Sequence, residues 1–428
     1  MSSHGADRGP ARIVPLLYLA TAHVALALAC FVVGWWPQAV AGFFYHAWMV
    51  AIVHLITLGW ITFSILGAIY IVGPIALRIP IPVRWGDYVA YALSLIGVVG
   101  MVSHFWIQEY GGMAWSATTV TAGILFVAIR IVRALPHAGI PAAVKLHLGF
   151  ACLNILLAAS MGILLGFDKT YHFLPGFVLS NVFAHAHLAA VGWATMMVVG
   201  VAYRMLPMTF PSRMPGGRSI YASAIMLETG VLGLFGALLW RSAWALVFGL
   251  AIVAGLGVFA AHVVWMLRSP ALKPPGTSRV DVGVLHAASA GVSLLAAVAI
   301  GLTLLLAPSS SWTLRAAAAY GVFGLVGFLA QMVVAMEARL VPLFAWYWAR
   351  AKNEQVAPAS PFTMRDRTLQ TVVFAGWTVG VPALAAGLFL ESAPLVAVGA
   401  WSLLAAVAVG TLDNVFVLLH VRRQAPVK

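Results

Sequence analysis

Long apolar runs recur along the whole sequence, and they limit its possible folds more than any other feature. Each has about 20 residues, the length that an α-helix needs to cross a bilayer. The composition agrees, because 63% of the residues are hydrophobic and only 8% are charged, too few polar groups for a water-soluble domain. We therefore expect an all-α integral membrane protein, one membrane domain over residues 1–428. Twelve spans are predicted, at 13–36, 46–74, 88–108, 115–134, 143–167, 179–207, 219–240, 243–267, 282–306, 313–342, 369–390 and 395–420.

The basic residues test this number of helices. With twelve spans, 21 of the 24 lysines and arginines fall on the side of the N-terminus, and only Lys169, Arg241 and Arg315 fall on the other. The positive-inside rule then predicts that both termini are cytoplasmic. The net charge of +13 is accordingly a topology signal. No basic cluster lies on a soluble module, so we expect contact with membrane lipid and none with nucleic acid.

Two of the spans share a motif. Residues 53–74 read VHLITLGWITFSILGAIYIVGP, and residues 181–207 read NVFAHAHLAAVGWATMMVVGVAYRMLP. His54 and His187 each begin the same frame, His-x4-Gly-Trp-x6-Gly-x2-Tyr-x3-Pro. A third stretch, VGFLAQMVVAMEARLVP at 326–342, keeps the glycine and the proline but has Val322 at the place of the histidine.

A second pair of stretches repeats as well. LHLGFACLNILLAASMG at 146–162 and LHAASAGVSLLAAVAIG at 285–301 both have a histidine at the second position and a glycine at the last. Such self-similarity predicts repeated structural units. We therefore expect three four-helix units, at about 1–140, 141–280 and 281–428, with the twelve helices in three pseudo-symmetric arcs.

Three histidines, His54, His185 and His187, lie inside predicted spans at similar depth. All three are in the half of the bilayer that is opposite the termini. Ionisable groups in a membrane indicate function, and neutral imidazole is a common ligand of iron and copper. Residues two apart on a helix differ by about 200°, so His185 and His187 point into different spaces. The repeat favours one site with His54 and His185 and a second with His187. The pairing of His54 with His187 is an alternative, as is plain interhelical hydrogen bonding.

Other polar and aromatic residues have weaker patterns. His104 is a candidate copper ligand or a partner of one, or else an interfacial histidine in an aromatic belt. Trp60 and Trp193 either line a cofactor or fill the bundle. The predicted spans also contain three acidic residues, Glu228, Glu337 and Asp413. They either carry protons or pair with arginines near the interface. The nearest such pair in the sequence is Glu337 with Arg339.

The stretch HAHLAAVGWATMMVVGVAYRMLP resembles the tenth helix of subunit I in the haem–copper oxidase superfamily. It is most similar to the cbb-type cytochrome c oxidases and the nitric oxide reductases. In that family the two histidines of this frame hold two haems. The resemblance implies a subunit I-like fold of twelve helices in three arcs. It also implies that His185 binds a high-spin haem and His187 a low-spin haem, of b type, with one or two haems in all.

The sequence departs from that family at the copper site. The family has one histidine on its sixth helix and an adjacent pair on its seventh, but residues 219–240 contain none. If the match is shifted by one repeat, the second and third spans take the place of the family's copper-binding helices. They offer only His54 and His104 as copper ligands. Copper is therefore a second candidate cofactor, and catalysis as an oxidoreductase stays open.

The resemblance implies a haem-binding protein of the bacterial inner membrane that transfers electrons in a respiratory chain or reduces oxygen or nitric oxide. Its expected partner is a cytochrome c or another electron-donor subunit. One alternative is a non-catalytic haem or copper protein for nitric oxide sensing or tolerance, similar to NnrS-like proteins. Another is a proton-coupled transporter, although the sequence lacks the six-helix inverted repeat that many transporters have.

Overall fold

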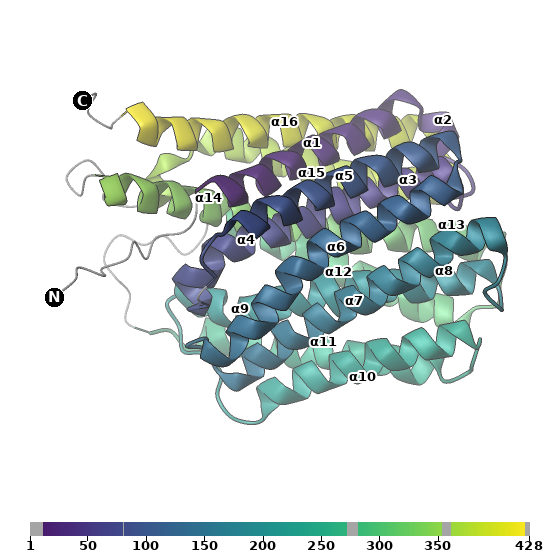
Figure 1. Cartoon of the computed structure of the whole chain (residues 1–428), viewed down its shortest axis with the longest axis horizontal. Coiled ribbons are helices and arrows are strands. Elements are labelled where there is room, and N and C mark those ends of the chain that lie inside the picture. Colours follow the sequence, from purple (N-terminus) through teal and green to yellow (C-terminus); the bar gives the residue numbers. More distant parts are fainter. Residues whose placement is uncertain (1–11, 80, 272–280, 353–360, 424–428) are drawn as a thin grey trace.

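The computed structural model describes residues 12–79, 81–271, 281–352 and 361–423. Within these ranges twelve helices are long and apolar enough to cross a membrane, so the predicted number of spans is confirmed. Nine spans are single helices, numbered here as in Figure 1: α1 (Ile13–Trp35), α5 (Trp85–Ile107), α6 (Tyr110–Ala134), α7 (Ala142–Tyr171), α10 (Ser219–Leu239), α11 (Ala245–Arg268), α12 (Val282–Leu306), α15 (Arg367–Phe389) and α16 (Ala393–Arg423).

Spans two, six and ten, counted along the chain, are composite. Span two joins α3 (Ala47–His54), η1 (Leu55–Thr62), α4 (Phe63–Val72) and η2 (Gly73–Leu77). Span six joins α8 (Val178–His187), η4 (Leu188–Thr195) and α9 (Met196–Thr209), and span ten joins α13 (Ser311–Gly321), η5 (Val322–Ala330) and α14 (Gln331–Lys352). Short helices in the connections are α2 (Pro37–Val40), η3 (Leu135–His137) and η6 (Pro361–Met364).

Span ten differs most from the prediction. It was expected to end at Pro342, but that proline lies inside α14, and the helix continues to Lys352. Membrane helices tolerate proline because neighbouring groups satisfy the backbone carbonyl that it leaves free. The apolar pattern therefore located the span, and the proline was not a stop signal.

A π-helix occurs at a matching place in each composite span. The segments η1, η4 and η5 begin directly after His54, His187 and Gly321. A π-helix has i→i+5 hydrogen bonds, so it accommodates an extra residue and redirects the side chains around it. The three π-helices contact one another, and spans two, six and ten are the most buried of the twelve. The repeated sequence frame thus forms the middle of the bundle.

The repeated glycine of each frame lets its span approach the first helix of its own unit. A Cβ atom added at any of the three would lie 2.5 to 2.6 Å from a side-chain atom, closer than packing permits. Small residues commonly allow such close approach in membranes. The pairs are Gly59 with Ala25 of α1, Gly192 with Asn154 of α7, and Gly327 with Ser293 of α12.

The remaining spans follow one another around these three. Contacts join α5 to α6, α6 to α7, α10 to α11, α11 to α12 and α15 to α16, and α16 returns to α1. Figure 1 shows that α1 begins and α16 ends at the same end of the bundle, as an even number of spans requires. We call this end the terminal side.

Candidate functional site

His54 and His185 are held in the same way. His54 ends α3 and His185 lies in the last turn of α8, each just before a π-helix. The Nδ1 atom of His54 is 2.8 Å from the carbonyl oxygen of Val50, and that of His185 is 2.9 Å from the carbonyl oxygen of Ala158 on α7. A carbonyl oxygen only accepts, so each Nδ1 carries the hydrogen, and in the neutral ring the Nε2 atom presents a lone pair.

The two Nε2 atoms have no hydrogen-bond partner among the described residues. The rings of His54 and His185 are also close enough to interact electrostatically. A histidine whose Nδ1–H is held by a carbonyl and whose Nε2 is free has the arrangement typical of a metal ligand. The structure therefore gives both histidines a free Nε2 atom and an electrostatic interaction with each other, and they come from spans two and six, which are in contact.

His187 lies at the next contact, between spans six and ten. Its Nδ1 atom donates to the carbonyl oxygen of Phe183 at 2.7 Å, and its Nε2 atom is 3.0 Å from the hydroxyl of Tyr320. The two rings stack with centroids 5.9 Å apart. Since Nδ1 carries the hydrogen, the tyrosine hydroxyl donates to Nε2. His187 is thus engaged with span ten rather than with His54.

Tyr320 was not among the residues predicted from the sequence. The alignment that puts Val322 at the place of His187 also puts Tyr320 at the place of His185. That alignment is the signal in the sequence that points to Tyr320, a polar ring at the place of a histidine. Tyr320 bonds to His187 and stacks on it, at the contact between spans six and ten.

The first helices of units two and three make room for these rings. A Cβ atom at Gly162 of α7 would lie 3.0 Å from Cε1 of His185, and one at Gly301 of α12 would lie 3.0 Å from Cε2 of Tyr320. Both glycines end the second repeated stretch of the sequence. Their repetition therefore has a physical reason, because each one is packed against a ring at a contact between spans.

His104 lies beside the pair but not in it. Its Nδ1 atom is 2.7 Å from the carbonyl oxygen of Gly100, and its Nε2 atom is 3.6 Å from Oε2 of Glu109. The next residue, Phe105, stacks on His54 with centroids 5.5 Å apart. In the described ranges no three or more His, Cys, Asp or Glu side chains form a group that could hold a metal ion, so His104 does not complete a three-ligand site with the pair.

Trp60 and Trp193 link the π-helices. The indole nitrogen of Trp60 donates to the carbonyl oxygen of Ala330 in η5, and that of Trp193 donates to the hydroxyl of Thr62 in η1, both at 3.2 Å. Both side chains are buried. Phe328 stands at the matching place in span ten and has no such hydrogen to donate. These contacts give both tryptophans a packing role in the middle of the bundle.

The donor set at the first contact is two neutral imidazoles, which suit iron and copper. No protein-family model matches this chain, and no curated protein matches it. The chemistry of the site therefore rests on the residues themselves.

Proposed function

We propose that this protein is a haem-binding membrane protein that transfers electrons or reduces a small diatomic molecule, oxygen or nitric oxide. The observation that carries the proposal is the pair of unclaimed Nε2 lone pairs on His54 and His185, which come from equivalent spans of two repeats. Haem iron needs only one or two protein ligands, because the macrocycle supplies four. The arrangement of basic residues supports cytoplasmic termini, and the family resemblance supports a bacterial inner membrane location.

The protein's part in this chemistry is to hold the ligands. A bound haem supplies an iron that changes its oxidation state. The carbonyl groups of Val50 and Ala158 fix the orientation of the two rings and increase the electron density on Nε2. Gly162 provides the space in which the ring of His185 lies. An electron-donor partner such as a cytochrome c fits this proposal, as does a haem of b type.

His187 has a different role in the same proposal. Its Nε2 lone pair is taken by Tyr320 in this structure, so it would bind a second haem only after the hydroxyl turned away. A second candidate function is a non-catalytic haem or copper protein for nitric oxide tolerance. The sequence favours it at one point, because the seventh span lacks the histidines of the catalytic copper site in the family that the chain resembles.

Optical spectra test the proposal. The protein is purified in detergent from haem-replete cells, and spectra of the oxidised and reduced forms are recorded beside a haem extract and an iron and copper analysis. We expect a sharp reduced α band that is lost in His54→Ala and His185→Ala. The matched control is His137→Ala, an exposed histidine on the terminal side, which should keep the band.

Several outcomes would count against the proposal. A colourless protein that contains neither iron nor copper would exclude haem and leave transport. A band that depends on His187 but not on His54 would move the ligand site to the alternative histidine.

Addition of carbon monoxide to the reduced protein then separates the two haem functions. A spectral shift indicates an open iron that can bind a diatomic molecule, and no shift indicates electron transfer alone.

A further inference from the structure

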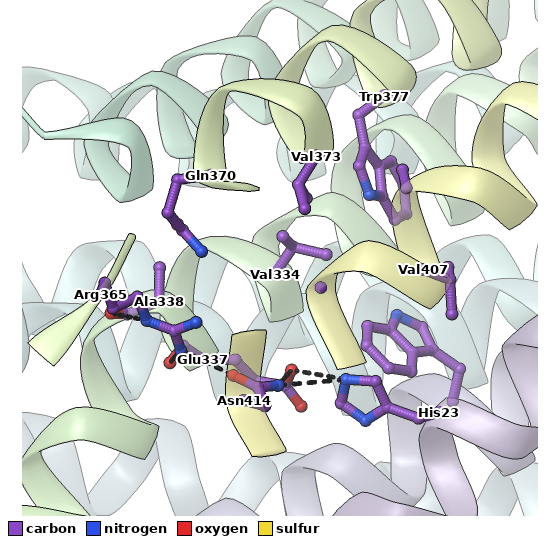
Figure 2. A pocket seen from close by; sticks show the side chains of 13 residues that line it. His23, Val334, Glu337, Ala338, Arg365, Gln370, Val373, Trp377, Val407 and Asn414 are labelled. Carbon is purple, nitrogen blue, oxygen red and sulfur yellow. Dashed lines mark hydrogen bonds and ion pairs between the residues drawn. The ribbon is translucent and has the colours of Figure 1, made fainter. Parts of the chain in front are cut away.

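A buried polar cluster lies where α1, α14, α15 and α16 meet, apart from the candidate site. Figure 2 shows His23, Glu337 and Asn414 converging, with Arg365 beyond Glu337. Such groups are rare inside a membrane because each one costs free energy unless it is paired. Glu337 is only 5% exposed and Asp413 only 1%. The polar members are His23, Glu337, Arg365, Gln370, Asp413 and Asn414.

The contact between His23 and Glu337 requires a proton. Nδ1 of His23 donates to the carbonyl oxygen of Leu19 at 2.9 Å, so Nε2 of the neutral ring has a lone pair. That Nε2 atom lies 3.2 Å from Oε2 of Glu337, and an ionised carboxylate also presents only lone pairs. Two acceptors at this distance repel each other unless one of them carries a hydrogen.

Asn414 contacts both groups that can hold that hydrogen. Its Oδ1 atom accepts from Arg365 at 2.8 Å, which orients the amide group toward the pair. Its Nδ2 atom donates to Oε2 of Glu337 at 3.3 Å and lies 3.2 Å from Nε2 of His23. Nε2 has a single lone pair, so it accepts a hydrogen either from Asn414 or from a protonated Glu337, or it carries the proton itself and donates to Glu337. In each arrangement that holds the proton, it lies on one of the two groups, and Asn414 keeps the carboxylate oxygen next to the imidazole.

The charges of the cluster lead to the same result. Arg365 donates to Asp413 at 2.5 Å, so these two charges balance, and Gln370 donates to the same carboxylate oxygen at 2.5 Å. Among the described residues, Arg365 and Asp413 are the other charged groups that face the pair. Arg339, two residues beyond Glu337 on α14, pairs with Asp281 at 2.7 Å. One bound proton is therefore what makes the cluster neutral, and burial in a membrane favours neutrality.

The cluster also has space for water. A cavity of about 30 Å³ lies among His23, Trp60, Glu337 and Asn414. Such a volume holds about two water molecules, and a water needs polar partners. The second carboxylate oxygen of Glu337, Oε1, is buried and has no hydrogen-bond partner. It is therefore a partner that water in this cavity can use, and water can bring a proton to it.

We propose that His23 and Glu337 form a proton-binding site that shares one proton and exchanges it with the terminal side. Arg365 lies in the connection between η6 and α15, so the cluster extends to that side of the bundle. Asn414 joins Arg365 to the pair. The site is independent of whether His54 and His185 bind haem.

Infrared difference spectra test the proton. The protein is reconstituted in lipid, and spectra are recorded as the buffer changes from mildly acidic to alkaline. We expect a pH-dependent band of the carboxyl or imidazole group that changes as the shared proton leaves, and its loss in Glu337→Gln. The control is Glu228→Gln, another buried carboxyl group, which bonds to Asn154 at 2.6 Å outside the cluster and should leave the band in place.

His23→Gln provides a second test should Glu337→Gln fail to fold, because it removes the other half of the shared site and should also alter the band. The proposal is overturned if no pH-dependent band requires Glu337 or His23, or if Glu228→Gln removes the same band. Vesicles with one orientation test the side of entry. A pH change on the terminal side alone should produce the band change, and a response only to the opposite side would contradict the proposed route.

Discussion

At the scale of single residues, the candidate ligand His185 depends on the glycine opposite it. Gly162→Ala would place a Cβ atom 3.0 Å from Cε1 of the ring, so the ring must shift by a few tenths of an ångström. Metal ligation tolerates little displacement of a ligand. We expect Gly162→Ala to weaken or shift the absorption of bound haem, measured as the reduced α band per mole of protein.

The same helix offers a matched control. A Cβ atom at Gly149 of α7 would meet nothing within 4 Å. Alanine is favoured over glycine in a helix by about 0.5–1 kcal/mol, so Gly149→Ala should be neutral or stabilising. Equal spectra for the two alanine variants would show that the glycine next to His185 has no special role.

At the scale of elements, the three π-helices depend on the tryptophans that join them. Trp60→Phe removes the hydrogen bond to the carbonyl oxygen of Ala330 in η5 and leaves a small gap in the core. Such losses typically cost about 1–3 kcal/mol. We expect a lower thermal midpoint in detergent, followed by tryptophan fluorescence, and a similar decrease for Trp193→Phe.

An exposed tryptophan provides the comparison. Trp115 on α6 is 66% exposed, so Trp115→Phe should change the stability by less than about 0.5 kcal/mol. If Trp60→Phe were as mild as Trp115→Phe, the hydrogen bonds between the π-helices would contribute little to the stability of the bundle.

At the scale of the whole molecule, twelve spans and the distribution of charge determine the orientation in the membrane. Of the basic residues, only Lys169, Arg241 and Arg315 lie on the side away from the termini. The positive-inside rule then predicts cytoplasmic termini. We expect a fluorescent protein fused to the C-terminus to fold in the cytoplasm of a bacterial host. A phosphatase inserted after Arg241, between α10 and α11, should be active in the periplasm.

The opposite pattern of reporter activity would reverse the topology. It would also move the proposed proton-binding site to the periplasmic side, because that site opens toward the terminal side. If both reporters were on the same side of the membrane, that result would contradict the five spans between Arg241 and the C-terminus.

The number of spans followed from the sequence alone. A bilayer requires a fixed length and an apolar composition of each span, so these can be read without any tertiary contact. The repeat also predicted how the histidines point. His54 and His187 are equivalent in the repeat, so they should point the same way around the molecule, and His185 should point the other way, toward His54. The same alignment also predicts a role for Tyr320, since it aligns with His185.

Only the tertiary structure decided the partners of the buried charges. Glu337 and Arg339 were interpreted as neighbours, but residues two apart on a helix point about 200° apart. Glu337 faces His23 on α1 and Arg339 faces Asp281 next to α12. His23 and Glu337 belong to the first and the third repeat, and they meet because α16 returns to α1 and brings α14 with it. The sequence determines which helices form, whereas contacts between distant helices depend on how all twelve pack together.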